Sequence, residues 1–206
     1  MIYRGQNQRR SIIMPTKKAT HLEIYIVITA VIFSACATPS TQIYNVPANS
    51  TGVIELDKII DIVLRGDTNE LKSVIRLTQT NCTFADGLGG PPKCLGKEQE
   101  GAIVEVLPIL DSEGHFLRKD ELESWDGLEV SALFAVYEAA KPIYVDENYP
   151  SGKYAIVFIG KDKNTNITLR VDQGSIVRID YGFGSPPAIR EDEVVRYLIQ
   201  PIDVIP

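Results

Sequence analysis

Histidine and cysteine are scarce in this chain, which has two histidines and three cysteines among 206 residues. Catalytic zinc usually draws on several histidines, so the sequence is a poor candidate for a zinc enzyme. No serine lies in a Gly-x-Ser-x-Gly motif, which argues against a serine nucleophile of that type. His115 is the one histidine beyond the first 35 residues, and its neighbour Gly114 predicts a surface turn rather than a catalytic base.

Basic residues are also in deficit, with 21 of them against 27 acidic residues and a formal net charge of −6. Five of the basic residues and one of the acidic residues fall within the first 35, which leaves 16 basic and 26 acidic residues in the remainder. Nucleic acid and anionic lipid both select a positively charged surface. The composition therefore predicts neither nucleic-acid binding nor electrostatic attachment to lipid.

The length of the N-terminal apolar run argues against a membrane-spanning helix. The run extends from Ile24 to Ala35, which is 12 residues, whereas a spanning helix needs about 20. Cys36 follows the run directly. The basic residues that precede it are Arg4, Arg9, Arg10, Lys17 and Lys18. A basic segment, an apolar segment and small residues at the end are the pattern of a secretory signal.

The residues Phe33-Ser34-Ala35-Cys36 resemble the lipobox of bacterial lipoproteins. The resemblance implies cleavage before Cys36, acylation of that cysteine, and attachment through its acyl chains to the outer membrane or the cell surface. Phe33 stands where the motif usually has leucine. An ordinary secretory signal or a retained membrane anchor stays open as an alternative, as does a translation start at Met14 rather than Met1.

We accordingly expect a signal peptide over residues 1–35, a tether over residues 36–50 and a single extracytoplasmic domain over residues 51–206. The residues directly after Cys36 are small and polar without an apolar pattern, which is typical of a tether. The remaining length is sufficient for one domain with its own hydrophobic core.

Cys82 and Cys94 are the other two cysteines, and turn-forming residues fill the segment between them. Outside the cytoplasm such a pair predicts a disulfide, which for a loop of this size stabilises the fold by ~3 kcal/mol. A metal site lacks further ligands, since no histidine lies nearby. The glycine-rich residues 87–93 lack the Lys-Ser/Thr pair of a phosphate-binding loop, and their prolines remove backbone donors.

The hydrophobic pattern predicts an α+β fold. Helical spacing occurs over residues 53–64, and Asp67 with Glu70 forms the capping-box pattern of a second helix. We expect this N-terminal helix pair to pack on a curved antiparallel sheet of about four or five strands, followed by a short C-terminal helix. The expected strands are 101–110 (interrupted at Pro108), 130–138, 153–160, 167–171 and 176–181, and the expected shorter helices are 119–126, capped by Asp120, and 190–200.

This order of elements is similar to that of nuclear-transport-factor-2-like and cystatin-like folds. The similarity concerns element order and not a sequence motif. It implies a cone-shaped pocket between helix and sheet, in folds that include both enzymes and pure binding modules.

Two turns are conceivable for the last hairpin. A two-residue turn at Gln173-Gly174 would pair Leu169 with Arg178 and so bring opposite faces together. A three-residue loop over 172–174 would pair Leu169 with Val177 and keep apolar side chains on one face. We therefore predict the three-residue loop.

Two polar segments resemble functional sites only in part. Residues 162–166 have the alternating oxygen ligands of a calcium loop, but Ile167 lies where glycine is needed and Gln173 where glutamate is needed. The acidic residues near Trp125 are expected to form a solvated helix face. They are Asp120, Glu121 and Glu123.

The sequence thus indicates no catalytic residue, metal site or cofactor. We expect a lipid-anchored domain that binds an unidentified small molecule or an envelope protein. The alternatives are a hydrolase or isomerase that uses His115 or a buried carboxylate as base, and an accessory subunit of a cell-envelope complex. An enzyme predicts His115 or an acid in a deep cleft, and an accessory subunit predicts a large exposed apolar patch.

Overall fold

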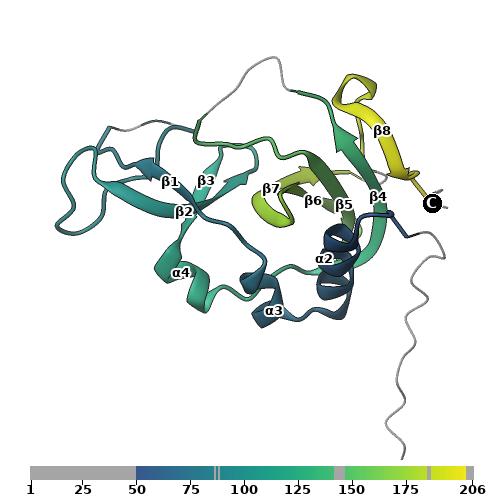
Figure 1. The fold of residues 1–206 in the computed structure, drawn as a ribbon. Coiled ribbons are helices and arrows are strands. Elements are labelled where there is room, and N and C mark those ends of the chain that lie inside the picture. The colour runs from purple at the N-terminus through teal and green to yellow at the C-terminus, as the bar shows by residue number, and fades with distance from the viewer. Residues whose placement is uncertain (1–49, 86, 88, 142–146, 185–186, 203–206) are drawn as a thin grey trace, which may run out of the picture. The chain divides into compact units, whose positions relative to one another are not determined.

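The computed structural model describes residues 50–85, 87, 89–141, 147–184 and 187–202 (Figure 1). The expected signal peptide, Cys36 and the tether up to residue 49 lie outside the described residues. Within the described part, no helix combines the length and the apolar character needed to span a bilayer.

Helix α2 spans Ile54–Arg65 and confirms the predicted helical spacing. It ends at Gly66, whose φ of 67° allows Asp67 N–H to bond to Ile62 O at 3.2 Å. The side chains that α2 buries against the sheet are Leu56, Ile59, Ile60, Ile62 and Val63.

The start of α2 is fixed by Asp57. The Oδ1 atom of this residue accepts hydrogen bonds from Thr51 N at 2.9 Å and from Thr51 Oγ1 at 2.7 Å. Thr51 is 8% exposed and is the one polar residue among the buried residues of the described chain. These hydrogen bonds therefore fix Thr51, just before the first turn of α2, to the helix.

Two shorter α-helices follow in the described part of the chain. In α3 (Thr68–Ser73) the Asp67 side chain accepts a hydrogen bond from Glu70 N, as the capping pattern predicts. Helix α4 (Lys119–Ser124) lies between strands rather than with the other two. It begins after Arg118, whose N–H donates to Glu121 Oε2 at 2.9 Å, so the predicted cap at Asp120 is wrong.

Eight strands form one mixed sheet in the described part of the chain. They are β1 (Thr78–Asn81), β2 (Ile103–Leu110), β3 (His115–Arg118), β4 (Val130–Ala139), β5 (Tyr154–Gly160), β6 (Thr165–Asp172), β7 (Ser175–Phe183) and β8 (Val194–Ile199). The order is β1-β2-β7-β6-β5-β4-β8, and β3 also pairs with β2. Among these strands only β2 and β7 pair in parallel, through Ile109↔Ile179 and Leu110↔Asp180.

The α+β class is therefore confirmed, whereas the expectation of four or five antiparallel strands is wrong. Strands β1 and β3 have only four residues each and β1 contains no apolar residue, so a hydrophobic pattern does not reveal them. Strand β2 also continues through Pro108, where an interruption was expected. Along one edge of β2, the neighbouring strand changes at Pro108. Strand β1 pairs with β2 up to Val106, and β7 pairs with β2 from Ile109 onward. A residue without an N–H is tolerated at such a gap.

The predicted helix over 190–200 is wrong as well. Residues Glu191–Glu193 form a single 3₁₀ turn, and the chain continues as β8, in which Tyr197 pairs with Tyr137 of β4. The backbone groups at the edge of β4 need partners, and β8 supplies them. Valine and tyrosine also favour a strand over a helix.

The β6–β7 hairpin turns through two residues, so the predicted three-residue loop is wrong. Gln173 and Gly174 both have positive φ, 49° and 74°, and the register shifts by one residue between Arg170 and Val171. The β-bulge leaves Val177 as the extra residue and pairs Leu169 with Ile179 rather than with Arg178. Apolar side chains thus stay on one face despite the short turn.

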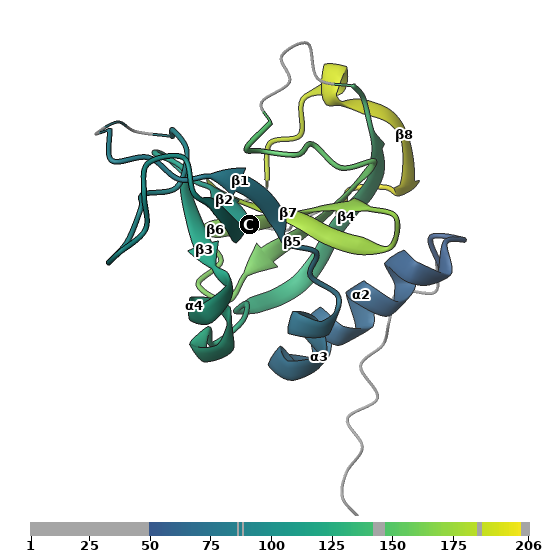
Figure 2. The ribbon, with the colours of Figure 1, turned by 60° about the vertical axis from the view of Figure 1, so that its left-hand side comes forward.

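The sheet packs apolar side chains on both faces. One cluster joins the buried side chains of α2 to Ile156 and Phe158 of β5 and to Leu169 of β6. A second cluster contains Ala155 and Val157, the alternate residues of β5, and therefore lies on the opposite face. Figure 2 shows α2 and α3 on one side of β4 and β5 and the chain that leads into β8 on the other.

Candidate functional site

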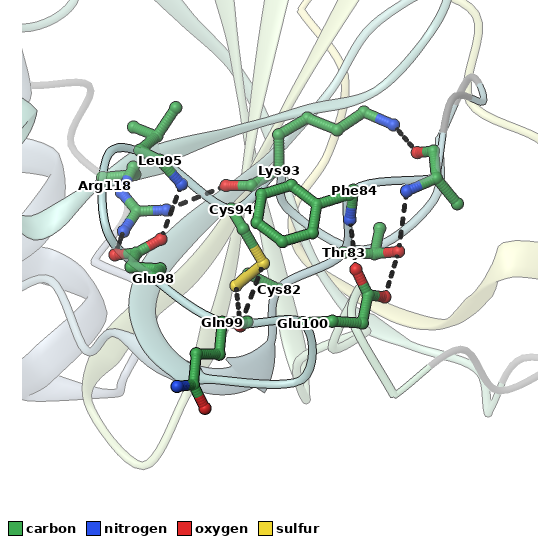
Figure 3. Close-up of a disulfide and its surroundings, with 11 residues drawn as sticks. Cys82, Thr83, Phe84, Lys93, Cys94, Leu95, Glu98, Gln99, Glu100 and Arg118 are labelled. Carbon is green, nitrogen blue, oxygen red and sulfur yellow. Dashed lines mark hydrogen bonds and ion pairs between the residues drawn. A yellow bond between two sulfur atoms is a disulfide. The ribbon is translucent and has the colours of Figure 1, made fainter.

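The predicted disulfide between Cys82 and Cys94 is present, with a Cα–Cα distance of 4.9 Å (Figure 3). It packs against Val104 and Val106 of β2 and is almost fully buried. Because the two sulfurs are bonded to each other, neither is available as a thiolate ligand to a metal. The nearby Glu98 is paired with Arg118. The disulfide therefore has a structural role.

Glu100 holds the first residues of the loop that the disulfide closes. Its carboxylate accepts hydrogen bonds from Thr83 Oγ1 at 2.6 Å and from the N–H of Phe84 (Figure 3). Both hydrogen bonds lower the pKa of Glu100, and the bond from Thr83 has the larger effect. Phe84 is 57% exposed on this loop. Hydrogen bonds thus hold the described residues at the start of the loop.

His115 lies at the start of β3 with its side chain 55% exposed. Its Nδ1 is 3.3 Å from Asp111 Oδ2, and Asp111 also accepts hydrogen bonds from the N–H groups of Glu113 and Gly114. The arrangement is a turn on the surface. His115 does not line the pocket described below.

The other two polar segments are local structure. Asp162 Oδ1 accepts hydrogen bonds from Asn164 N, Thr165 N and Thr165 Oγ1, so this carboxylate is used within its own turn. In α4, Glu121 caps the helix while Asp120 lies exposed on it. None of these acidic residues lines the pocket described below.

A depression on the sheet face opposite α2 gathers polar side chains that the sequence pattern does not single out as a site. We call it the Arg170 pocket. It is a small depression of about 130 Å³ that is partly open to solvent, which is below the size of most sites for drug-sized ligands and leaves room only for a small one. It is lined by Tyr137 of β4, Val157 of β5, Asn166, Thr168 and Arg170 of β6, Asp180, Tyr181 and Gly182 of β7, and Pro187, Ala188, Ile189 and Glu193 of the segment that leads into β8.

A charged network forms one wall of the pocket. Arg170 lies directly opposite Arg178 across the β6–β7 pair, a position where like charges repel. Asp180 compensates by accepting hydrogen bonds from Arg170 Nε at 2.7 Å and from Arg178 Nε at 2.6 Å. The three side chains are only 11–16% exposed, so their hydrogen bonds are poorly screened by water.

Two more groups surround the outer end of Arg170. Its Nη2 is 3.8 Å from Glu193 Oε2, and Tyr137 lies beside it. Burial disfavours the charge on Arg170, but Asp180, Tyr137 and Glu193 outweigh burial and raise the pKa of the guanidinium. Burial also raises the pKa of Tyr137, so its hydroxyl stays protonated at neutral pH. The pocket thus offers a fixed cation with hydroxyl and amide groups beside it.

Part of this site has a signal in the sequence. Thr168 and Arg170 on one strand, and Arg178 and Asp180 on the next, alternate with apolar residues and so share a face of the hairpin. Nothing in the pattern shows that Tyr137 and residues 187–193 would enclose that face. In comparisons with protein families and with solved structures, the chain matches no family model and no solved structure.

Proposed function

We propose that this protein is a lipid-anchored extracytoplasmic module that binds a small molecule without transforming it. The observation that carries the binding part is the Arg170 pocket, where a largely shielded guanidinium faces a small depression that is open to solvent. The Cys36 pattern supports the anchor. The Cys82–Cys94 disulfide is in keeping with an oxidising compartment outside the cytoplasm.

The pocket favours binding over catalysis. A general base needs a free lone pair and an adjusted pKa. Asp180 instead accepts three hydrogen bonds from two arginines, including one from Arg178 Nη2 at 3.0 Å, so its carboxylate is engaged within the protein. His115, the base considered in the sequence, is exposed on its turn.

The alternative of an accessory subunit has less support. The large exposed apolar residues lie on different elements of the described chain. Examples are Ile54, Phe84, Ile103, Phe183 and Val195. Scattered residues of this kind are normal on monomers. The pocket also lies on the face opposite α2, so the binding proposal does not depend on the similarity to folds whose pocket lies between helix and sheet.

Binding is tested by ligand-observed NMR on the full chain with a library of polar small molecules. We expect hits that are lost in Arg170→Gln and retained in Arg196→Gln. Arg196 is the matched control, because it pairs with Glu138 at the surface and is 63% exposed. In Arg170→Gln, Asp180 keeps Arg178 as its partner, so no buried charge is left alone. Hits that survive Arg170→Gln would contradict the assigned site.

The anchor is tested by the intact mass of the protein isolated from a bacterial membrane fraction. We expect a chain that begins at Cys36 and carries acyl chains, because two or more chains are needed for stable attachment. Cys36→Ser is the control and should release the protein from the membrane. A mature chain with an unmodified thiol at Cys36 would remove the anchor from the proposal.

A further inference from the structure

Glu193 occupies an unusual position at the pocket. Its backbone is fixed, since Glu193 O accepts a hydrogen bond from Ala140 N at 2.8 Å and Glu193 N donates to Arg190 O at 3.0 Å. Its side chain is 40% exposed. The carboxylate lies 3.8 Å from Arg170 Nη2 and 3.8 Å from Arg190 Nε, both beyond hydrogen-bond distance. The side chain can therefore turn away without any change in the backbone.

The guanidinium of Arg170 donates a hydrogen bond to Asp180 through Nε, while its two Nη atoms lie toward the pocket side of the network. The bond to Asp180 fixes the plane of the guanidinium. Its two Nη atoms carry four N–H groups, and in the described part of the chain the further groups beside them are the Tyr137 hydroxyl, which forms a hydrogen bond with Arg170, and the Glu193 carboxylate at 3.8 Å. A guanidinium held in this way presents a fork that matches the two oxygens of a carboxylate.

We propose that the Arg170 pocket binds the carboxylate of a small organic acid, and that Glu193 is a built-in competitor for the same position. This proposal rests on the binding function proposed above. The ligand carboxylate takes the place beside Arg170 that the Glu193 carboxylate occupies in the free protein, and Glu193 turns toward solvent and Arg190.

The rest of the lining suits the remainder of such a ligand. Thr168 supplies a hydroxyl group on the same face of β6 as Arg170, and Asn166 supplies an amide further along that strand, which fits a polar group on the ligand near the carboxylate. Val157, Pro187 and Ile189 supply an apolar side for a short hydrocarbon or ring. The ligand class is therefore an organic acid with one adjacent polar group and a small apolar part.

The two charged contacts predict effects of different size. Hydrogen bonds between ligand carboxylate and Arg170 are charge-assisted and shielded, so we expect loss of Arg170 to weaken binding about 10- to 100-fold. Glu193 is partly exposed and makes no hydrogen bond to Arg170, so its removal should strengthen carboxylate binding only about two- to fivefold.

The experiment titrates the full chain with two acids and their neutral amides, followed by NMR shifts of the arginine Nε–H groups. The probes are benzoate and N-acetylglycine, against benzamide and N-acetylglycinamide. We expect the acids to bind about tenfold or more tightly than the amides, because only the acids form charge-assisted bonds. Glu193→Gln should tighten binding of the acids and leave the amides unchanged.

Glu191→Gln is the matched control, since Glu191 lies on the same 3₁₀ turn and is exposed but does not line the pocket. It removes the same charge and should leave all affinities unchanged. Equal binding of acids and amides in the pocket would overturn the carboxylate proposal while the binding function stands. Equal gains in Glu191→Gln and Glu193→Gln would overturn the competitor role. Failure of every probe and of the wider library would overturn both proposals.

Discussion

The two faces of the β6–β7 hairpin differ sharply although they alternate along the same two strands. On one face Ile167, Leu169 and Ile179 are at most 3% exposed and pack against the cluster under α2. On the other face Arg170 and Asp180 are also largely shielded, yet they line a pocket. Burial on the first face is a matter of packing, whereas on the second it depends on hydrogen bonds between charges. Apolar packing on the first face stabilises the domain, and the second face carries the charged groups of the proposed binding site.

The largest effect should come from the packed face. Leu169→Ala removes a side chain with no exposure from the main cluster, and we expect a loss of about 2–5 kcal/mol in the free energy of unfolding. Thr168→Ala, one residue away on the pocket face, should cost less than about 1 kcal/mol. Urea unfolding with the disulfide intact measures both. Equal costs would show that the two faces contribute alike.

The next effect concerns the charged network. Asp180→Ala leaves Arg170 and Arg178 opposite each other without their shared acceptor, and we expect a loss of about 2–3 kcal/mol. Arg170→Gln should cost only about 1 kcal/mol, because Asp180 keeps its bonds to Arg178. Urea unfolding of both variants provides the test. A more harmful Arg170→Gln would mean that Asp180 is not the centre of the network.

A smaller effect should follow from changing the turn that joins the two strands. Gly174 has φ of 74°, which an L side chain adopts with strain, so Gly174→Ala should cost about 1 kcal/mol. Gly90→Ala is the control, since an added Cβ there meets nothing within 4 Å. Thermal unfolding compares the two. An undisturbed Gly174→Ala would argue against the two-residue turn.

The smallest effect is a dependence on pH at the start of α2. Burial tends to raise the pKa of Asp57, but hydrogen bonds from Ser50 and Thr51 outweigh it and the pKa is lowered. The stabilisation is thus complete above the unfolded pKa and is lost as the pH falls through the folded pKa. Asp57→Asn should lose less than about 1 kcal/mol at pH 7 and show a flatter stability curve below pH 4. Parallel curves for the two proteins would contradict this role.

Several elements follow directly from the sequence because a single local cause decides them. The apolar spacing of α2 and the cap that Asp67 forms with the N–H of Glu70 depend on residues close together in the sequence. The disulfide likewise follows from two cysteines in a turn-rich segment. Where local pattern and tertiary contact agree, the prediction is confirmed.

The errors arise where a distant contact decides. Alternation along β7 breaks at Val177, and no residue in the sequence marks that bulge. Val194, Val195 and Leu198 fit helical spacing equally well, and only the open edge of β4 draws them into a strand. The candidate site was missed for the same reason. Arg170 and Asp180 share a face by alternation, but Tyr137 and Glu193 reach them only through the folded sheet.

The clamp between Thr51 and Asp57 has a consequence for access to solutes. It fixes the point where a tether would join the domain at the start of α2, on the side of the sheet away from the Arg170 pocket. An acylated Cys36, as proposed, would be separated from this point by 15 residues, which span at most about 50 Å when extended. Even with the helical side resting on a bilayer, the pocket would open toward the surrounding fluid.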